Sequence, residues 1–117
     1  MQMTMIRVIN NEVLPYGGIA RKFEGWRYGA ENVSFFLVEA PPGSGPGLHT
    51  HPYEEVFVVQ EGQATFTVGE ATIEAVGGQV VAVPAGVAHG FVNSESKPLR
   101  QVDIHASGRM TTEWLEG

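Results

Sequence analysis

The chain has 117 residues and 43% hydrophobic content, which suits one domain that buries its own core without disulfides or a structural metal. Seven Lys+Arg against 13 Asp+Glu give a formal net charge of −6, which repels phosphate backbones and anionic membranes, so neither nucleic acid nor a membrane is an expected partner. Cysteine is absent, which removes disulfides, thiolate catalysis and Cys-based zinc sites.

The first quarter of the chain is expected to contain short strands and turns. Residues 4–8 suit a first strand, and residues 1–13 lack the apolar run of a signal peptide, so we expect a cytoplasmic protein. In residues 21–28 charged and aromatic residues alternate, which predicts a strand near a sheet edge. Trp26 and Tyr28 can line a ligand pocket, but packing at a barrel rim or a dimer interface is the favoured interpretation.

Residues 32–40 are apolar on both faces of a predicted strand, which indicates that both faces are covered. One face needs a second layer, and a homodimer is expected to supply it. Residues 41–47 are rich in Pro and Gly. They form either a stiff approach that fixes His49 or simply a surface loop.

A rapid series of strands is predicted for the rest of the chain. Turn residues separate these strands at short intervals, a spacing typical of hairpins in an all-β domain closed as a jelly roll. The predicted strands are residues 55–60, 64–68, 71–76, 79–83, 88–93 and 99–105. Only residues 111–116 suggest a helical turn, with Thr111 or Thr112 as its cap.

Three of the four histidines lie in two short segments. In an extended segment, residues two apart point the same way, so His49 and His51 converge, and Glu55 keeps that parity. His89 lies in the second segment and shares a strand face with Asn93. Imidazole and carboxylate together suit a borderline or hard divalent metal ion.

The segments 43–62 and 78–93 resemble the two signature motifs of the cupin family. The first reads Gly43, five residues, His49-x-His51, three residues, Glu55, six residues, Gly62, and the second reads Gly78, five residues, Pro84-x-Gly86, two residues, His89, three residues, Asn93. The resemblance implies an all-β cupin double-stranded β-helix, a jelly-roll barrel, with residues 1–117 forming a single domain.

The same resemblance implies a metal site made by His49, His51, Glu55 and His89, with open positions for water or substrate. The ion would be a divalent transition metal, and Fe, Mn, Ni, Cu and Zn all remain open. Resemblance to some family dioxygenases also permits a catalytic role for Glu55, which would leave the metal and serve as a base. The contrasting interpretation is a degenerate cupin whose histidines merely fill the barrel.

The neighbours of these residues are assigned by strand parity. Glu54 is expected on the outer face, and Tyr53 is expected to pack at an exposed position rather than at the pocket rim. The rings of Phe57, Phe66 and Phe91 are expected in the core and the pocket wall.

The last histidine lies on a predicted strand with alternating polarity. Val102 and Ile104 alternate with Gln101, Asp103 and His105, and parity alone does not tell which face is inside. For His105, surface or interface hydrogen bonding is favoured over a role as catalytic acid or base.

Taken together, these features predict a metal-binding cupin that acts on or binds a small organic molecule at an open metal site, with dioxygenase- or isomerase-type chemistry if it is an enzyme. The alternative is a non-catalytic binding or sensing module that uses the same pocket. The family hosts both kinds of protein, so the motifs do not decide whether turnover occurs.

Overall fold

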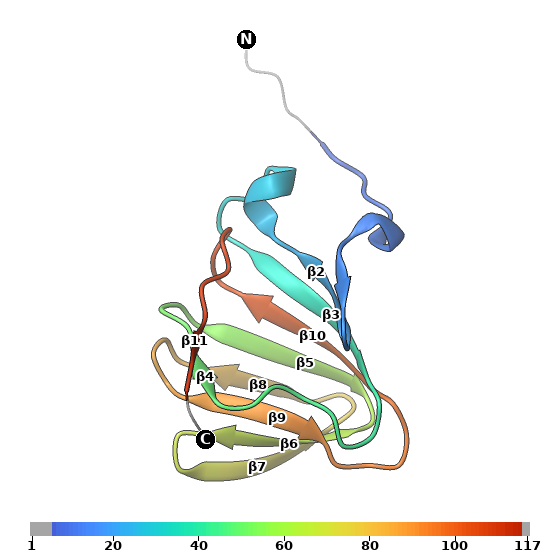
Figure 1. Cartoon of the computed structure of the whole chain (residues 1–117), viewed down its shortest axis with the longest axis vertical. Helices are drawn as coiled ribbons and strands as arrows, with labels where there is room; N and C mark the ends of the chain where they lie inside the picture. The colour runs from blue at the N-terminus through green and yellow to red at the C-terminus, as the bar shows by residue number, and fades with distance from the viewer. Residues whose placement is uncertain (1–5, 116–117) are drawn as a thin grey trace.

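The computed structural model describes residues 6–115, which form two antiparallel sheets packed on one another (Figure 1). The six-stranded sheet has the order β1-β2-β3-β10-β5-β8, and the five-stranded sheet has the order β11-β4-β9-β6-β7. The strands are β1 Tyr16–Gly17, β2 Ala20–Phe23, β3 Ser34–Ala40, β4 His49–Thr50, β5 Glu55–Glu61, β6 Gln63–Val68, β7 Ala71–Val76, β8 Val80–Val83, β9 His89–Asn93, β10 Leu99–His105 and β11 Glu113–Trp114. Two 3-10 helices, η1 Asn11–Val13 and η2 Gly25–Tyr28, complete the elements.

The jelly-roll architecture predicted from the spacing of strands and turns is confirmed. Strands β5 to β10 reproduce the six predicted segments to within one residue at either end. Within residues 6–115 there is no α-helix, and neither 3-10 helix is long and apolar enough to cross a membrane. β10 lies between β3 and β5 in the middle of its sheet, so both of its edges are paired. Its face with Gln101, Asp103 and His105 is buried, whereas Val102 and Ile104 on the other face are half-buried.

The core lies between the two sheets and is organised by three aromatic rings. Phe57 of β5, Phe66 of β6 and Phe91 of β9 are buried, and their ring centroids lie 5.0 to 5.9 Å apart in edge-to-face or tilted arrangements. Burial of each ring contributes about 1.5–3 kcal/mol. The predicted core position of all three rings is therefore confirmed, and the barrel is held by apolar packing from both sheets.

The chain between β3 and β4 is pressed against the backbone of β9. A Cβ added at Gly45 would collide with the carbonyl oxygen of Phe91, and one added at Gly90 would lie 2.8 Å from the carbonyl oxygen of Pro46. The Asn93 N–H donates to the carbonyl oxygen of Ser44 at 2.9 Å. This segment is thus a fixed approach to His49 rather than a free surface loop.

Three local expectations are corrected. The strand predicted for residues 4–8 lies partly outside the described residues, and residues 6–8 belong to no strand. The strand predicted for residues 21–28 ends at Phe23, since η2 begins at Gly25, where a Cβ would collide with backbone oxygens of Val33 and Ala30. In place of the helical turn predicted for residues 111–116, residues 113–114 form strand β11.

The aromatic residues of η2 lie on the outside of the barrel. The guanidinium carbons of Arg27 and Arg109 lie 4.5 and 4.1 Å from the ring centroid of Trp26, and the ring of Tyr28 stacks on Phe23 at 4.9 Å. Neither Trp26 nor Tyr28 is among the residues that line the cavity described below. Their arrangement agrees with the favoured interpretation of packing at the rim.

Candidate metal centre

The structure brings the four predicted ligand residues together inside the barrel. His49 opens β4 and is the register partner of His89 on β9, while Glu55 opens β5. His51 follows β4 directly. One potential donor atom from each residue lies within 4.8 Å of the others, and all four residues are buried. Two strands of one sheet and one strand of the other therefore converge on a single point.

Each of the three histidines is oriented by a hydrogen bond to a backbone carbonyl. The Nδ1–H groups of His49, His51 and His89 donate to the carbonyl oxygens of Gly47 at 2.7 Å, Thr111 at 2.8 Å and Val87 at 2.8 Å. Because a carbonyl oxygen only accepts, Nδ1 carries the proton in each ring. The Nε2 atoms are left as the donor atoms that can bind a metal, the arrangement expected of oriented metal ligands.

The Glu55 carboxylate joins these histidines through one oxygen. Its Oε1 lies 2.9 Å from Nε2 of His89 and 3.1 Å from Nε2 of His51. The His51 contact lacks hydrogen-bond geometry, so the buried Nε2 of His51 has no hydrogen-bond partner within residues 6–115. An unpaired buried nitrogen aimed at a carboxylate oxygen fits a cation between them. The donor set therefore suits a divalent metal ion.

The second oxygen of Glu55 is held by the histidine whose role sequence parity left open. Nε2 of His105 lies 3.1 Å from Oε2 of Glu55, and Nδ1 of His105 lies 2.7 Å from the hydroxyl of Tyr53. That hydroxyl accepts a hydrogen bond from the N–H of Thr111 at 3.2 Å, so its own proton points to His105. His105 in turn donates from Nε2 to Glu55. The expectation of surface or interface hydrogen bonding for His105 is wrong.

Tyr53 is likewise misplaced by sequence reasoning. It was expected at an exposed packing position, yet its ring stacks on His51 at 5.1 Å and its hydroxyl bonds to His105. Burial raises the pKa of Tyr53 to about 12, so its proton stays in place at neutral pH. Glu54 is exposed on the outer face, as predicted. Tyr53 differs from Glu54 because the turn before β5 folds the Tyr53 side chain back over His51.

The ionisation of the cluster follows from these contacts. Burial opposes the charge on Glu55, but hydrogen bonds from His105 and its neighbouring imidazoles outweigh it and hold the pKa of Glu55 well below its usual range. Burial lowers the pKa of His49. Burial also opposes the charge on His89, yet its hydrogen bond to Glu55 dominates and raises the pKa of His89. Both directions favour an ionised Glu55 carboxylate beside a protonated His89 in the metal-free chain.

The C-terminal segment fastens the ligand strand from outside. Glu113 and Trp114 of β11 pair with Thr50 and His49 of β4, and the Leu115 N–H donates to the Leu48 carbonyl oxygen at 3.1 Å. The Trp114 ring lies 4.8 Å from the His49 ring. The predicted helical turn is wrong here because these backbone groups bond across to β4.

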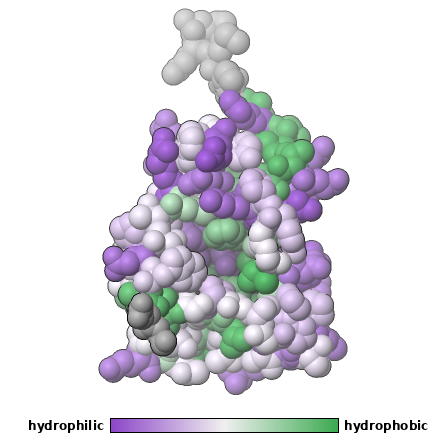
Figure 2. All heavy atoms as spheres, in the orientation of Figure 1, coloured by the Kyte–Doolittle hydropathy of each residue, from purple (hydrophilic) through white to green (hydrophobic). Residues whose placement is uncertain are grey.

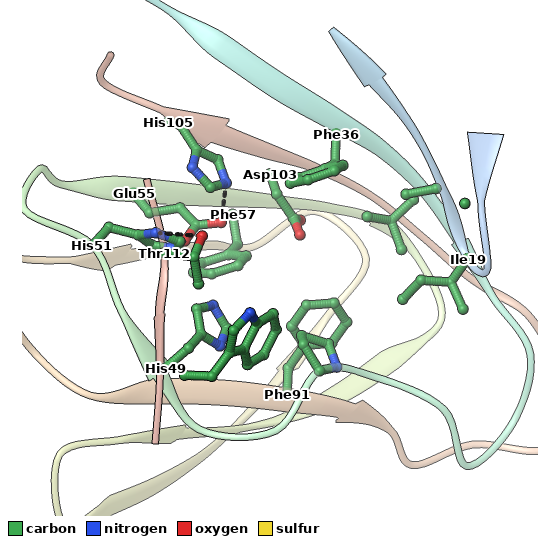
Figure 3. Close-up of a pocket in the computed structure, with 15 residues that line it drawn as sticks. Ile19, Phe36, His49, His51, Glu55, Phe57, Phe91, Asp103, His105 and Thr112 are labelled. Carbon is green, nitrogen blue, oxygen red and sulfur yellow. Dashed lines mark hydrogen bonds and ion pairs between the residues drawn. The ribbon is translucent and has the colours of Figure 1, made fainter. Parts of the chain in front are cut away.

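A cavity of about 180 Å³ opens beside the metal-binding residues. Figure 3 shows the His49, His51 and Glu55 side chains at one end and Ile19 at the other, with Asp103 between them. Phe57 and Phe91 form part of the predicted apolar wall, whereas Phe66, predicted with them, lies in the core and does not line the cavity. Figure 2 shows a small group of apolar residues near the middle of the face toward the viewer and another at the upper right, among pale and hydrophilic residues. The full lining is Gly17, Ile19, Ala20, Phe36, Val38, Pro46, His49, His51, Glu55, Phe57, Phe91, Asp103, His105, Thr112 and Trp114.

Metal affinity is expected to fall as pH drops from about 7.5 to 5, because the imidazoles must be neutral to bind. A raised pKa keeps a proton on His89 at a pH where an ordinary imidazole is neutral, so competition begins above the ordinary value near 6.5. Displacing one proton per ion changes the affinity roughly tenfold per pH unit. Chelator competition at several pH values measures this change in metal affinity. A constant affinity over this range would contradict histidine ligation.

Fold and site together define a jelly-roll barrel with three inward histidines and one carboxylate at its centre. The family model described as "Cupin domain" matches residues 36–105, which contain all four of these residues. The chain belongs to the cupin family.

Similar proteins extend this family assignment. An uncharacterized protein of Streptomyces coelicolor is 42% identical over 60 residues, which cover 51% of this chain and 57% of that protein. The chain thus spans little more than half of that relative.

Several solved structures share the fold. A conserved protein from Klebsiella pneumoniae with a double-stranded beta-helix domain has a TM-score of 0.75 and 21% identity, covering 97% of this chain and all of that one. Oxalate decarboxylase from Lactobacillus farciminis, in a formate complex, has a TM-score of 0.76 and 22% identity over 87% of this chain and 33% of its own. Bacillus subtilis oxalate decarboxylase, which has Mn(II) centres, has a TM-score of 0.76 and 24% identity over 88% of this chain and 29% of its own.

Proposed function

We propose that this cupin binds a small organic molecule through an oxygen donor at an open position of a divalent metal ion held by His49, His51, Glu55 and His89. The observation that carries the proposal is the orientation of the three rings. Each Nδ1 is committed to a backbone carbonyl, so each Nε2 is left to bind a metal. The Nε2 atoms of His51 and His89 lie 3.1 and 2.9 Å from Oε1 of Glu55. Histidines that only filled a barrel would have no need of that shared tautomer.

The charge balance supports an oxygen-donor ligand. Three neutral imidazoles and one carboxylate leave a divalent ion with a net charge of about +1 and one to three exchangeable positions. Such an ion, when bound, supplies Lewis acidity, a lowered pKa of bound water or, for redox-active metals, oxygen chemistry. Carboxylate, enol and vicinal oxygens are the ligand groups that match it. The negative charge of the whole chain is screened and does not oppose this local field.

The residues around the ion orient the Glu55 carboxylate and exclude water from part of the cavity. Phe57 and Phe91 keep water from the inner wall, and His105 holds Oε2 of Glu55 while Oε1 faces His51 and His89. If Glu55 acts as a base, Oε1 is the atom that takes the proton, since Oε2 already accepts a hydrogen bond. That catalytic role is part of the proposal.

Manganese is proposed as the first candidate metal, before iron, nickel, copper and zinc. The Bacillus subtilis oxalate decarboxylase, which has Mn(II) centres, contains a region that superposes on 88% of this chain with a TM-score of 0.76. The chain covers 29% of that protein, so its reaction is not carried over as a whole. Oxygenase-type and isomerase-type reactions remain the chemistry we propose for an open site of this composition.

A non-catalytic binding or sensing module is the second candidate, and the small cavity favours it. At about 180 Å³ the cavity is below the roughly 300–1,000 Å³ of sites for drug-sized ligands. A short metabolite can be held there without room for a second organic substrate. The cytoplasmic location and the homodimer expected from the sequence stay predictions.

Turnover separates the two candidates. Iron, manganese and nickel forms should be incubated with diketones, hydroxy acids, keto acids and oxalate while oxygen uptake and substrate loss are followed, with the His89→Ala variant as the control for free metal. We expect metal-dependent binding of at least one compound. Substrate loss with oxygen uptake supports a dioxygenase, and loss without it supports an isomerase or a lyase. Binding without turnover across the panel supports the binding module, whereas binding unaffected by metal removal contradicts both.

A further inference from the structure

Asp103 is a buried carboxyl group that the proposed metal site does not use. It lies on β10 opposite Phe57 of β5 and Phe36 of β3, and its residue surface is 5% exposed. Its Oδ1 has no hydrogen-bond partner within residues 6–115. Figure 3 shows the carboxyl group projecting into the cavity, between the end that holds Glu55 and the end that holds Ile19.

Gln101, on the same face of β10, is a buried polar neighbour of the Asp103 carboxyl, but it leaves Oδ1 of Asp103 without a hydrogen-bond partner within residues 6–115. A buried polar atom without a partner destabilises a fold, so residues in structural roles are normally satisfied. Asn93 on β9 shows the contrast. Its side-chain amide donates to the carbonyl oxygens of Ala40 and Lys97, and its oxygen accepts from the Glu95 N–H. Asp103 instead presents a free polar atom to a cavity.

We propose that Asp103 is the second polar anchor of this cavity and hydrogen-bonds a hydroxyl or carbonyl oxygen of the same molecule whose oxygen donor reaches the metal site. This inference rests on the proposed function, because it needs a ligand that already spans from the metal site into the cavity. The two anchors fix the orientation of the ligand, and the apolar wall near Ile19 and Val38 receives its carbon body.

The electrostatics of the cavity select a neutral second group. Burial, reinforced by the negative charge of Glu55 and opposed by a hydrogen bond to Gln101, raises the pKa of Asp103 well above its ordinary value. This shift favours the protonated carboxyl, a group that both donates and accepts hydrogen bonds. A second ligand carboxylate would be desolvated at a position where the cavity lining, within residues 6–115, offers no Lys or Arg to pair with it. The ligand class is therefore a short monocarboxylate or enol that carries a neutral hydroxyl or carbonyl group, and dicarboxylates are disfavoured.

Calorimetry on the zinc form tests this selectivity with five-carbon acids. Zinc is redox-inert, so binding is measured without oxygen chemistry. The probes are pentanoate, 3-, 4- and 5-hydroxypentanoate, 4-oxopentanoate and glutarate. At least one hydroxy or oxo acid is expected to bind about 5- to 30-fold more tightly than pentanoate, the gain from one buried hydrogen bond. Glutarate is expected to bind no more tightly than pentanoate.

Two substitutions assign that gain to Asp103. In Asp103→Leu, the affinity for the best probe is expected to fall to near the affinity for pentanoate, so that their ratio is close to one. The affinity for pentanoate itself is expected to be unchanged. Asp103→Asn retains hydrogen-bonding atoms and is expected to keep most of the ratio. The inference is overturned if the affinity ratio is unchanged in Asp103→Leu, or if no probe binds the unmodified chain more tightly than pentanoate does. In both cases metal-dependent binding of pentanoate would still support the proposed function. Absence of metal-dependent binding by every probe overturns the proposed function as well.

Thermal unfolding gives an independent readout. If Asp103 serves a ligand rather than the fold, Asp103→Leu removes an unpaired buried group and raises the Tm, by about 4 °C or more for a domain of this size. Asn93→Leu is the matched control, and its Tm should fall because three hydrogen bonds are lost. A fall in the Tm of Asp103→Leu comparable to that of the control would show a structural role and overturn the inference.

Discussion

Replacing His89 by alanine is expected to lower metal affinity by more than about 100-fold, while the barrel stays folded. Loss of a hydrogen-bond partner outside the ligand shell already costs 10- to 100-fold, and His89 is proposed as a ligand itself. The fold survives because its core of aromatic rings lies between the sheets and is independent of the ion. Chelator competition measures the affinity and circular dichroism measures the fold. His51→Ala should behave in the same way.

A core substitution should have the opposite effects to His89→Ala: it should lower stability and leave metal affinity unchanged. Phe66 is fully buried, and it is not among the residues that line the cavity. Phe66→Leu should lower the Tm through loss of packing yet keep the metal affinity. Wild-type affinity in His89→Ala would contradict the assignment of His89 as a ligand, and an unfolded His89→Ala chain would show that the ion is structural.

Replacing His105 by leucine is expected to lower metal affinity by about 10- to 100-fold, the second-largest effect. The substitution removes the hydrogen bond at 3.1 Å that holds Oε2 of Glu55 and so frees the carboxylate to turn away. His105→Gln should restore part of the affinity, because its amide can donate to the same oxygen. Tyr53→Phe should have a smaller effect, since Tyr53 acts on Glu55 only through His105.

A variant that combines Tyr53→Phe with His105→Leu tests whether Tyr53 supports Glu55 through His105 or by a separate contact. If Tyr53 works through His105, adding Tyr53→Phe to His105→Leu should cause little further loss of affinity. Additive losses would show that Tyr53 supports the site by another route, such as its stacking on His51. Wild-type affinity in His105→Leu would mean that His51, His89 and the ion orient Glu55 unaided.

Most of the barrel was predictable because its signals are local. The strands from Glu55 to His105 alternate in polarity and are separated by glycine and proline turns, so each boundary is marked within a few residues. The convergence of His49, His51 and Glu55 was predicted from strand parity, and the motif spacing added His89. The prediction is confirmed, although a turn separates His49 on β4 from Glu55 on β5, which belong to different sheets.

The errors occurred where pairing across the sheet decides the outcome. On β10 the polar residues Asp103 and His105 are buried, whereas the apolar Val102 and Ile104 are only half-buried. This reverses the usual pattern, so the alternation in polarity did not identify the inner face. The same parity would have placed both residues inside had the register of β10 with Glu55 been known. Strand β11 was missed because two residues, bonded across to β4, carry no periodic signal.

Elemental analysis of the purified chain tests the central claim most directly. The chain is expressed or reconstituted with iron, manganese, nickel, copper and zinc, each in turn, and the bound metal is measured after exhaustive dialysis. The arrangement of His49, His51, Glu55 and His89 predicts close to one ion per chain for at least one of these metals, and near none in His89→Ala. A folded, unmodified chain that retains none of the five metals would contradict it.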